Sequence, residues 1–432
     1  MSILLKPDPS PRRRSSYLAY SIRPFIMVAF VVIIITVVLA SLFRSSHAIK
    51  VPGADNNHKF KVAVSHFPLA DGARKDPYHP TEDRRVMVSL FMPIPKESCS
   101  SECSVDYMPP QTARIANEQF IVGGKRDIGV FETMTYDACC KSSSTIDASK
   151  TPVVVIEAHV DTSRLLYSTL ARYVAAGGAA VVLIDHPGDT SIVEFPTAGK
   201  RALDVVYNSG TVPLSNFSPI TSWNSTVIKA LETRTSDINF VLSQLKSPSL
   251  LPSHFPTFNF SPSSTLKLDS IGIVGHGLGG SVATSFGVTP NTTTTPTLFS
   301  INLSGTPPLL SSSVHNAPLF FFGRQDYRRE NDIHWPTTWS YLTGPATEFD
   351  LNDSAIFDVS DLPVIVELAQ NEGGKKDVRG NGLSGYAPVQ GRNAVTCFVE
   401  TIVKPQFELD PAGTLMNDCI RYFEGVVPYP GV

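Results

Sequence analysis

The stretch Ile271-Gly272-Ile273-Val274-Gly275-His276-Gly277-Leu278-Gly279-Gly280-Ser281-Val282-Ala283 decides the fold. An apolar run stops at a glycine, turns sharply and continues in small residues that suit a tightly packed helix. Strand, tight turn and helix in this order form a nucleophile elbow, which exposes one side chain above a sheet. The elbow pattern is Gly-x-Ser-x-Gly, and this chain reads Gly275-His276-Gly277-Leu278-Gly279. Gly277 therefore stands where the nucleophile is expected, and it has no side chain.

The same glycines allow a second interpretation, as a dinucleotide-binding loop. Gly275, Gly277 and Gly280 follow a strand pattern and match the Gly-x-Gly-x-x-Gly fingerprint. That fingerprint needs an acidic residue about 20 positions later to hold the ribose hydroxyls. No Asp or Glu lies between Asp269 and Asp326. We therefore disfavour nucleotide binding and predict no cofactor.

Strand and helix patterns alternate along most of the chain. Continuous apolar runs in its middle are typical of strands covered on both faces. Besides the elbow, we expect strands over 60–66, 85–92, 152–156, 179–184, 298–303, 318–322 and 347–351, and helices over 162–176, 227–245 and 393–402. This order predicts a doubly wound, mostly parallel sheet in one large α/β domain over 60–432.

The N-terminal segment carries a membrane signal. Residues 25–43 form an almost unbroken apolar run, long enough to cross about 30 Å of hydrocarbon as a helix. The basic tail over 1–24 should stay cytosolic. We therefore predict a transmembrane signal anchor over 25–43, a linker over 44–59 and a single-pass type II membrane protein with its body in the secretory lumen or outside. The alternative is secretion after signal cleavage near Ser46-His47-Ala48.

Cysteines and sequons agree with an oxidising, glycosylating compartment. The disulfide candidates, four of them in an excursion over 99–150, are Cys99, Cys103, Cys139, Cys140, Cys397 and Cys419. Their number is even and no Cys-x-x-Cys pair or clustered His suggests a metal, but six cysteines allow fifteen pairings. We do not expect the adjacent Cys139 and Cys140 to pair with each other. The predicted glycosylation sites are Asn216, Asn224, Asn259, Asn291 and Asn352. Asn302 also lies in a sequon, but we expect it to be buried in an apolar strand.

The overall charge and composition limit the possible partners. The chain is 42% hydrophobic and 17% charged, which is typical of a globular protein with a large core. A net charge of −3 and a pI near 6.4 give no electrostatic case for nucleic acid. Of membranes and nucleic acids, the sequence therefore predicts an interaction with a membrane only.

A series of short motifs runs through the domain in a fixed order. The motifs are KDPY (75–78), RRVMVSLF (84–91), YMPP (107–110), TSRLLY (162–167), IDHP (184–187), VEFP (193–196), the elbow and SDLP (360–363). This series resembles the platelet-activating factor acetylhydrolase-like α/β hydrolases, especially fungal membrane or secreted members. The resemblance implies an α/β-hydrolase fold and calcium-independent hydrolysis of short acyl esters of phospholipids by a Ser-Asp-His triad.

The resemblance also assigns the triad positions, and this chain has substituted each of them. Gly277 takes the place of the nucleophile, and Ser304 takes the place of the acid in a segment that resembles Asn-Leu-Asp-Gly. The histidine position, just before the SDLP motif, falls at about Ile356. The mechanism needs a hydroxyl, an imidazole and a carboxylate, and losing the nucleophile alone costs ~10⁶ in turnover in a comparable enzyme. We therefore predict a degenerate triad that no longer hydrolyses esters.

The oxyanion turn is altered as well. The resemblance places His159-Val160-Asp161 where the family has a Gly-aromatic-Gly turn, and it implies that the amides of Val160 and Leu278 remain possible oxyanion donors. His159, Asp161 and His276 are candidates for a repurposed polar pocket. We interpret three further polar residues as structural: Asp326 as a loop carboxylate beside Arg324, Ser281 as a helix-packing residue, and His186 as a support at its strand end.

These residues support three hypotheses about function. The leading one is a binding or interaction protein that has lost ester hydrolysis and holds a lipid or apolar small molecule in the inherited pocket. The second is an enzyme that uses His159, His276 or Asp161 in a non-triad reaction. The third is a residual hydrolase of short acyl esters of phospholipids.

Overall fold

The structure, a computed structural model, describes residues 48–54, 58–123, 129–196, 204–208, 220–262, 264–289, 295–384, 388–407, 419, 423 and 426–428. The chain divides into two units, Met1–His47 and Ala48–Val432. The predicted cytosolic tail and transmembrane anchor belong to the first unit and lie outside the described residues. Within the described ranges, no helix is both long and apolar enough to cross a membrane.

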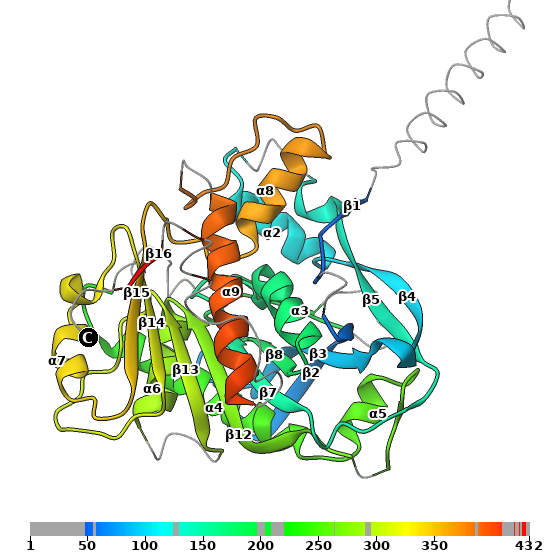
Figure 1. Ribbon diagram of the computed structural model, residues 1–432, viewed down its shortest axis with the longest axis horizontal. Coiled ribbons are helices and arrows are strands. Elements are labelled where there is room, and N and C mark those ends of the chain that lie inside the picture. The colour runs from blue at the N-terminus through cyan, green and yellow to red at the C-terminus, as the bar shows by residue number, and fades with distance from the viewer. Residues whose placement is uncertain are drawn as a thin grey trace, which may run out of the picture. The chain divides into compact units, whose positions relative to one another are not determined.

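A twisted central sheet organises the second unit (Figure 1). Within the described residues it has nine strands: β16 (Val426–Pro428), β15 (Ala346–Leu351), β14 (Leu319–Arg324), β13 (Thr297–Leu303), β12 (Lys267–His276), β7 (Pro152–Glu157), β8 (Ala180–Asp185), β3 (Asp83–Pro95) and β2 (Phe60–Lys75). The strands from β15 to β8 pair in parallel, whereas β3, β2 and β16 pair antiparallel at the edges. The predicted doubly wound, mostly parallel sheet is therefore confirmed.

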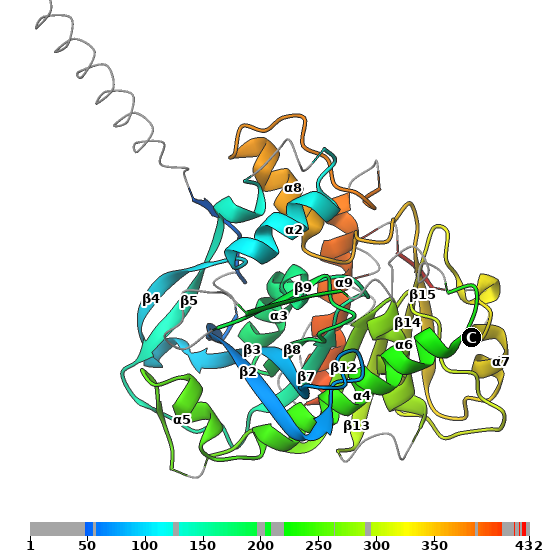
Figure 2. The ribbon, with the colours of Figure 1, turned by 180° about the vertical axis from the view of Figure 1, so that it is seen from behind.

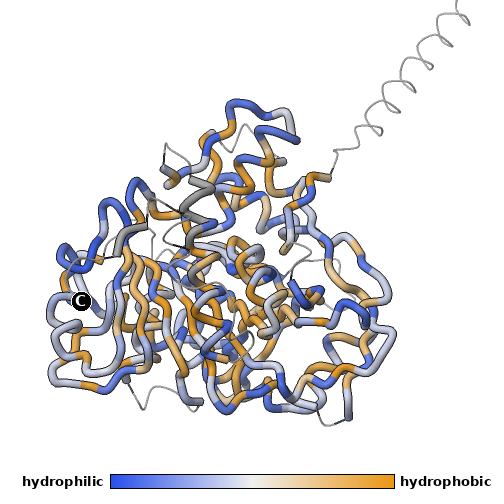
Figure 3. The backbone as a smooth tube through the Cα atoms, in the orientation of Figure 1, coloured by the Kyte–Doolittle hydropathy of each residue, from blue (hydrophilic) through white to orange (hydrophobic). Residues whose placement is uncertain are grey.

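Helices cover both faces of this sheet. In Figure 1, α3 (Ser168–Ala176) and α9 (Pro388–Gln406) lie toward the viewer, and Figure 2 shows α4 (Ser225–Leu245) and α6 (Leu278–Val288) on the opposite face. The helix α8 (Leu362–Asn371) lies above the strands in both views. Side chains of β7 alternate between two cores, since Val154 and Ile156 pack with α3 and α9 whereas Val153 and Val155 pack with α4 and α6. This double cover explains the continuous apolar strands, which appear as orange segments in Figure 3.

Shorter elements surround these layers. They are β1 (Ile49–Lys50), β4 (Cys99–Asp106), α2 (Pro110–Phe120), β5 (Met134–Ser142), β6 (Thr145–Ile146), β9 (Ile192–Phe195), β10 (Asp204–Tyr207), α5 (Leu250–His254), β11 (Asn259–Phe260) and α7 (Trp335–Ser340), with 3₁₀ turns over 96–98, 131–133, 164–167 and 329–331. β1 lies within the segment expected to be a linker. It pairs with β5, and Ile49 and Val51 are buried. The packed domain therefore extends N-terminal to residue 60.

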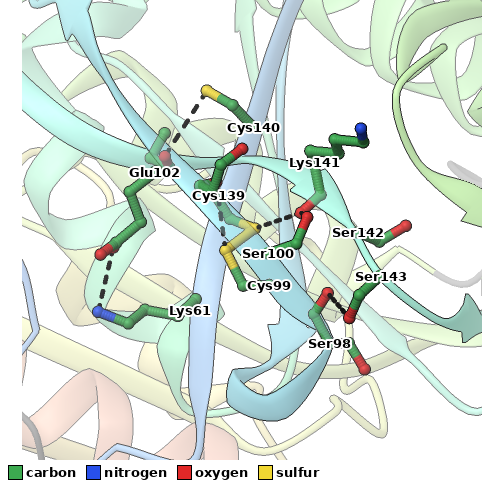
Figure 4. Close-up of a disulfide and its surroundings, with 12 residues drawn as sticks. Lys61, Ser98, Cys99, Ser100, Glu102, Cys139, Cys140, Lys141, Ser142 and Ser143 are labelled. Atoms are coloured by element: carbon green, nitrogen blue, oxygen red, sulfur yellow. Dashed lines mark hydrogen bonds and ion pairs between the residues drawn. A yellow bond between two sulfur atoms is a disulfide. The ribbon is translucent and has the colours of Figure 1, made fainter.

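All six cysteines are paired. Cys99–Cys139 and Cys103–Cys140 join the antiparallel strands β4 and β5, and Cys397–Cys419 ties α9 to the C-terminal segment. Figure 4 shows the first of these disulfides beside the Lys61–Glu102 ion pair. The adjacent Cys139 and Cys140 thus have separate partners, as expected.

The predicted sequons differ in exposure. Asn224 and Asn259 are exposed and Asn352 is half-buried. Asn216 and Asn291 lie outside the described residues. Asn302 is fully buried in β13, where its amide bonds Thr284 and Gly305, as its apolar setting predicted. Glycosylation itself stays a prediction.

Candidate functional site

The predicted strand, tight turn and helix of the elbow are present, with a glycine at the central position. β12 ends at His276, α6 begins at Leu278, and Gly277 between them has a φ of +54°. A Cβ added to Gly275 would overlap the main chain of Gly279, so strand and helix cross too closely for a side chain there. The turn lies at the carboxyl edge of the parallel strands, where doubly wound folds bind their ligands.

The space above Gly277 is filled by His159. A Cβ added to Gly277 would lie 2.7 Å from Cγ of His159 and closer still to its Cδ2 and Nε2. A side chain at residue 277 would therefore collide with the imidazole, which comes from the turn after β7. Gly277 has no side chain, and the ring of His159 occupies the space that one would take.

The hydroxyl of one tyrosine is hydrogen-bonded to two histidine residues beside the elbow. The hydroxyl of Tyr167 lies 2.7 Å from Nδ1 of His276 and accepts a hydrogen bond of 3.2 Å from the main-chain N–H of His159. The centroids of the two imidazoles are 4.9 Å apart in an edge-on arrangement. All three residues are buried. Within the described part of the chain, Nδ1 of His159 and Nε2 of His276 have no hydrogen-bond partner.

Both imidazoles are neutral at neutral pH. The pKa of His159 is lowered to about 3, mainly because the ring is buried and to a smaller extent because Arg234 is positively charged. Burial and the neighbouring His159 lower the pKa of His276 well below its ordinary value. Arg324, at the end of β14, acts on both rings through space and has a pKa lowered to about 10, chiefly by burial. The site therefore combines two uncharged rings with two nearby guanidinium groups, those of Arg234 and Arg324.

The two other triad positions lie next to the elbow. The main-chain N–H of Gly277 donates to the Leu303 carbonyl at 2.9 Å, which places Ser304 beside the turn. Ser304 has a φ of +57°, and its hydroxyl donates to the Phe322 carbonyl at 3.0 Å. The main chain of Ile356 lies close enough to His276 to influence its pKa. The structure thus brings together the three positions that the resemblance assigns to a triad.

Asp161 does not join the two histidines. Its carboxylate accepts a hydrogen bond of 2.8 Å from the Asn208 amide, and its N–H donates to the Asp189 carbonyl at 2.8 Å. Burial raises the pKa of this half-buried carboxyl group. Of the three residues suggested for a repurposed pocket, His159 and His276 converge, whereas the Asp161 carboxylate bonds a residue beyond β10.

The remaining candidates are placed as follows. The Asp326 side chain is 70% exposed and pairs with Arg324. Ser281 is fully buried in α6, and its hydroxyl donates to the Gly277 carbonyl at 3.4 Å. Within the described residues, the amides of Val160 and Leu278 donate no hydrogen bond; for Leu278 this follows from its position in the first turn of α6. The amide of Val160, in the turn after β7, and that of Leu278, at the elbow, thus have no acceptor within the described residues.

A buried ion network supports the turn that carries His159. Arg234 on α4 donates to the Ala158 carbonyl at 2.6 Å and pairs with Asp189 at 2.7 Å. His186 lies 2.9 Å from both Glu157 and Asp237. Burial alone would lower the pKa of His186, but Glu157 and Asp237 outweigh it and raise this pKa to about 9. The imidazolium of His186 is therefore a structural part of the support below the turn.

Sequence reasoning did not identify Tyr167, Arg234 or Arg324 as parts of this site. Arg234 had a detectable signal, because Ala230, Arg234, Asp237 and Val241 follow a helical spacing and all four are buried. Tyr167 lies in the TSRLLY motif. That motif contributed to the family resemblance but did not indicate a role for the tyrosine hydroxyl. No group of three or more His, Cys, Asp or Glu residues within the described ranges could hold a metal ion.

Comparisons with known proteins place this site in context. No protein-family model matches the chain. A probable 1-alkyl-2-acetylglycerophosphocholine esterase from Arthroderma benhamiae is 29% identical over 314 residues, which cover 70% of this chain and 72% of that protein. The solved structure of a ferulic acid esterase from Streptomyces cinnamoneus superposes with a TM-score of 0.60 and 18% identity, over 88% of this chain and 98% of that one. The second comparison shows a shared fold.

Proposed function

We propose that the chain, a relative of the platelet-activating factor acetylhydrolase-like α/β hydrolases, no longer hydrolyses esters. In this proposal it acts as a binding or interaction protein that holds a lipid or apolar small molecule at the inherited site. The fold and elbow are retained as a scaffold, and the chemistry is lost.

One observation carries the proposal: the imidazole of His159 occupies the space of the missing nucleophile side chain. A glycine alone removes the attacking hydroxyl. The ring goes further, because it leaves no room for a side chain at residue 277. Hydrolysis by the family mechanism needs a nucleophile within hydrogen-bond reach of its base, and residue 277 cannot supply one.

The other two triad positions support the same conclusion. Ser304 has no carboxylate to orient an imidazole, and its hydroxyl donates to the Phe322 carbonyl of the neighbouring strand. Ile356 cannot transfer a proton. Since the nucleophile, acid and base positions have all changed, a single replacement would not restore the mechanism.

The two unpartnered imidazole nitrogens support binding. Buried polar atoms in proteins almost always have a hydrogen-bond partner. Nδ1 of His159 and Nε2 of His276 have none within the described chain, and apolar groups such as Phe357 lie beside them. A small molecule with a polar group and an apolar body matches this combination.

A second candidate function is an enzyme with repurposed chemistry. The observation that favours it is the pair of buried, neutral imidazoles joined by Tyr167. A neutral imidazole can accept a proton from a bound substrate. In this case His159→Asn and His276→Asn would each abolish product formation, whereas a binder would lose affinity and have no product to lose.

We also propose that the body of the protein faces the secretory lumen or the cell exterior, held by the predicted anchor. Three disulfides in the folded unit and exposed sequons at Asn224 and Asn259 support this location. A full-length protein expressed in cells should shift in mobility on glycosidase treatment. An unchanged mobility together with reduced cysteines would overturn the proposed location.

Covalent labelling combined with lipid binding tests the proposed function. Purified full-length protein is treated with a fluorophosphonate probe, which reacts with activated serines, and is titrated separately with a fluorescent acetylated phospholipid. We expect no labelled serine, saturable lipid binding, and weaker binding in His276→Asn than in the surface control Lys246→Gln. Labelling of any serine would reveal a nucleophile and contradict the loss of hydrolysis, and absence of binding would contradict the binding role.

A further inference from the structure

A second polar cavity lies apart from the elbow, against the disulfide-linked strands. It has a volume of about 170 Å³ and is lined by Val51, Gly53, Lys61, Glu102, Asp137 and Arg172, among others. These residues come from the segment after β1, from β2, β4 and β5, and from α3. None of them belongs to the site described above.

Arg172 is the unusual member of this lining. It is 3% exposed, its Nη2 donates to the Val51 carbonyl at 3.4 Å, and its guanidinium lies 4.6 Å from the centre of the Tyr136 ring. Its Nη1 is buried without a hydrogen-bond partner. Gly53 lets the main chain approach, because a Cβ there would lie 2.8 Å from Nη2. One edge of a buried guanidinium is thus unsatisfied.

The other buried arginines have carboxylate partners, which makes the contrast informative. Arg84 pairs with Asp76 and Asp237, Arg164 with Asp185, Arg234 with Asp189 and Glu157, and Arg324 with Asp326. Among the described residues, no carboxylate forms an ion pair with Arg172. Burying a charge without a partner costs free energy, and buried charges in proteins are normally paired with an opposite charge.

The remaining charges of the lining already have partners. Lys61 pairs with Glu102 at 3.0 Å, and Lys50 pairs with Asp137. Asp361 acts on Arg172 through space, but its carboxylate accepts hydrogen bonds from Tyr107 and from the Thr169 N–H. Three cationic and two acidic side chains therefore line the cavity, which leaves one positive charge in excess.

We propose that this cavity binds a small oxyanion, a carboxylate or a phosphate group, against Nη1 of Arg172, with Lys61 near the bound group. Guanidinium groups bind such anions with two parallel N–H···O bonds. The cavity offers room for a phosphate, because a water occupies about 30 Å³ in the liquid. The bound anion supplies the partner that the chain itself does not provide.

Thermal unfolding of the full-length protein in increasing inorganic phosphate, at constant ionic strength, tests this site. A ligand that binds only the folded state raises the melting temperature in a saturable way. We expect this rise in the wild type and in the matched surface variant Arg114→Met, and its loss in Arg172→Met. An equal rise in all three proteins, or no rise in the wild type, would overturn the proposal.

Calorimetric titration gives a second measurement that does not depend on the folding of Arg172→Met. Lys61→Gln should bind phosphate about 3- to 10-fold more weakly than the wild type, since it removes one nearby cation, whereas Lys246→Gln should bind normally. Equal affinity in both variants contradicts the site. If glycerol 3-phosphate binds as tightly as inorganic phosphate, the natural anion is a phosphate headgroup. If glycerol 3-phosphate binds more weakly, the natural anion is a free ion. Both results support an oxyanion site.

Discussion

The imidazole of His159 occupies the space into which a side chain at residue 277 would project. The two residues come from the turns after β7 and β12, strands that are neighbours in the sheet. Their relationship is therefore steric: residue 277 has no side chain, and the ring from the neighbouring turn fills the volume that one would take. It makes specific predictions for both residues.

Restoring the serine alone should damage the protein. In Gly277→Ser the new side chain meets the His159 ring at a residue with positive φ, and overpacking of this kind costs about 1–3 kcal/mol. Urea unfolding would measure the loss. The second replacement, His159→Gly, removes the obstacle, so the double variant should be more stable than the sum of the single changes by about 1 kcal/mol or more. Additive effects would contradict the contact.

Removing the support below the oxyanion turn should be severely destabilising. Arg234→Met leaves Asp189 buried without its cation, leaves Glu157 with His186 as its ion-pair partner, and frees the Ala158 carbonyl. Breaking a buried ion pair from one side costs about 3–5 kcal/mol. The matched variant Arg114→Met lies on the surface and should change the free energy of unfolding by less than about 0.5 kcal/mol. Similar losses in the two variants would show that the network contributes little.

His186 should make stability fall on the alkaline side. Its folded-state pKa is raised to about 9 from an ordinary value of 6.5, so between these pH values the folded state binds more protons than the unfolded state. This contribution is fully present below pH 6.5 and is lost as the pH rises through about 9. Urea midpoints at pH 6.5, 7.5 and 9 would show a decline in the wild type and a shallower one in His186→Gln. An equal decline in both proteins would assign it to other groups.

The fold was predictable because its signals are local. Glycine spacing around Gly277 identified the elbow, and continuous apolar runs identified strands that are covered on both faces. β1 was missed because two residues, Ile49 and Lys50, are too few to show a periodicity. Their pairing with β5 also depends on residues that are distant in the sequence.

The site was predictable only in part. The substituted triad positions followed from the motifs, but the direction of each side chain follows from tertiary packing. His159, His276 and Asp161 were grouped by their nearness to the elbow, and the structure joins only the two histidines, because Asn208 and Asp189 hold Asp161 elsewhere. That a ring from one turn would fill the space above another could not be read from residue types.

The initial rate of acetyl release from an acetylated glycerophospholipid measures the central claim most directly. The wild-type protein is compared with the double variant His159→Asn/His276→Asn, and with a four-fold variant that carries Gly277→Ser, Ser304→Asp, Ile356→His and His159→Gly. We predict that the wild-type rate equals that of the double variant and the background, and that only the four-fold variant can gain activity. A wild-type rate above that of the double variant would contradict the loss of hydrolysis.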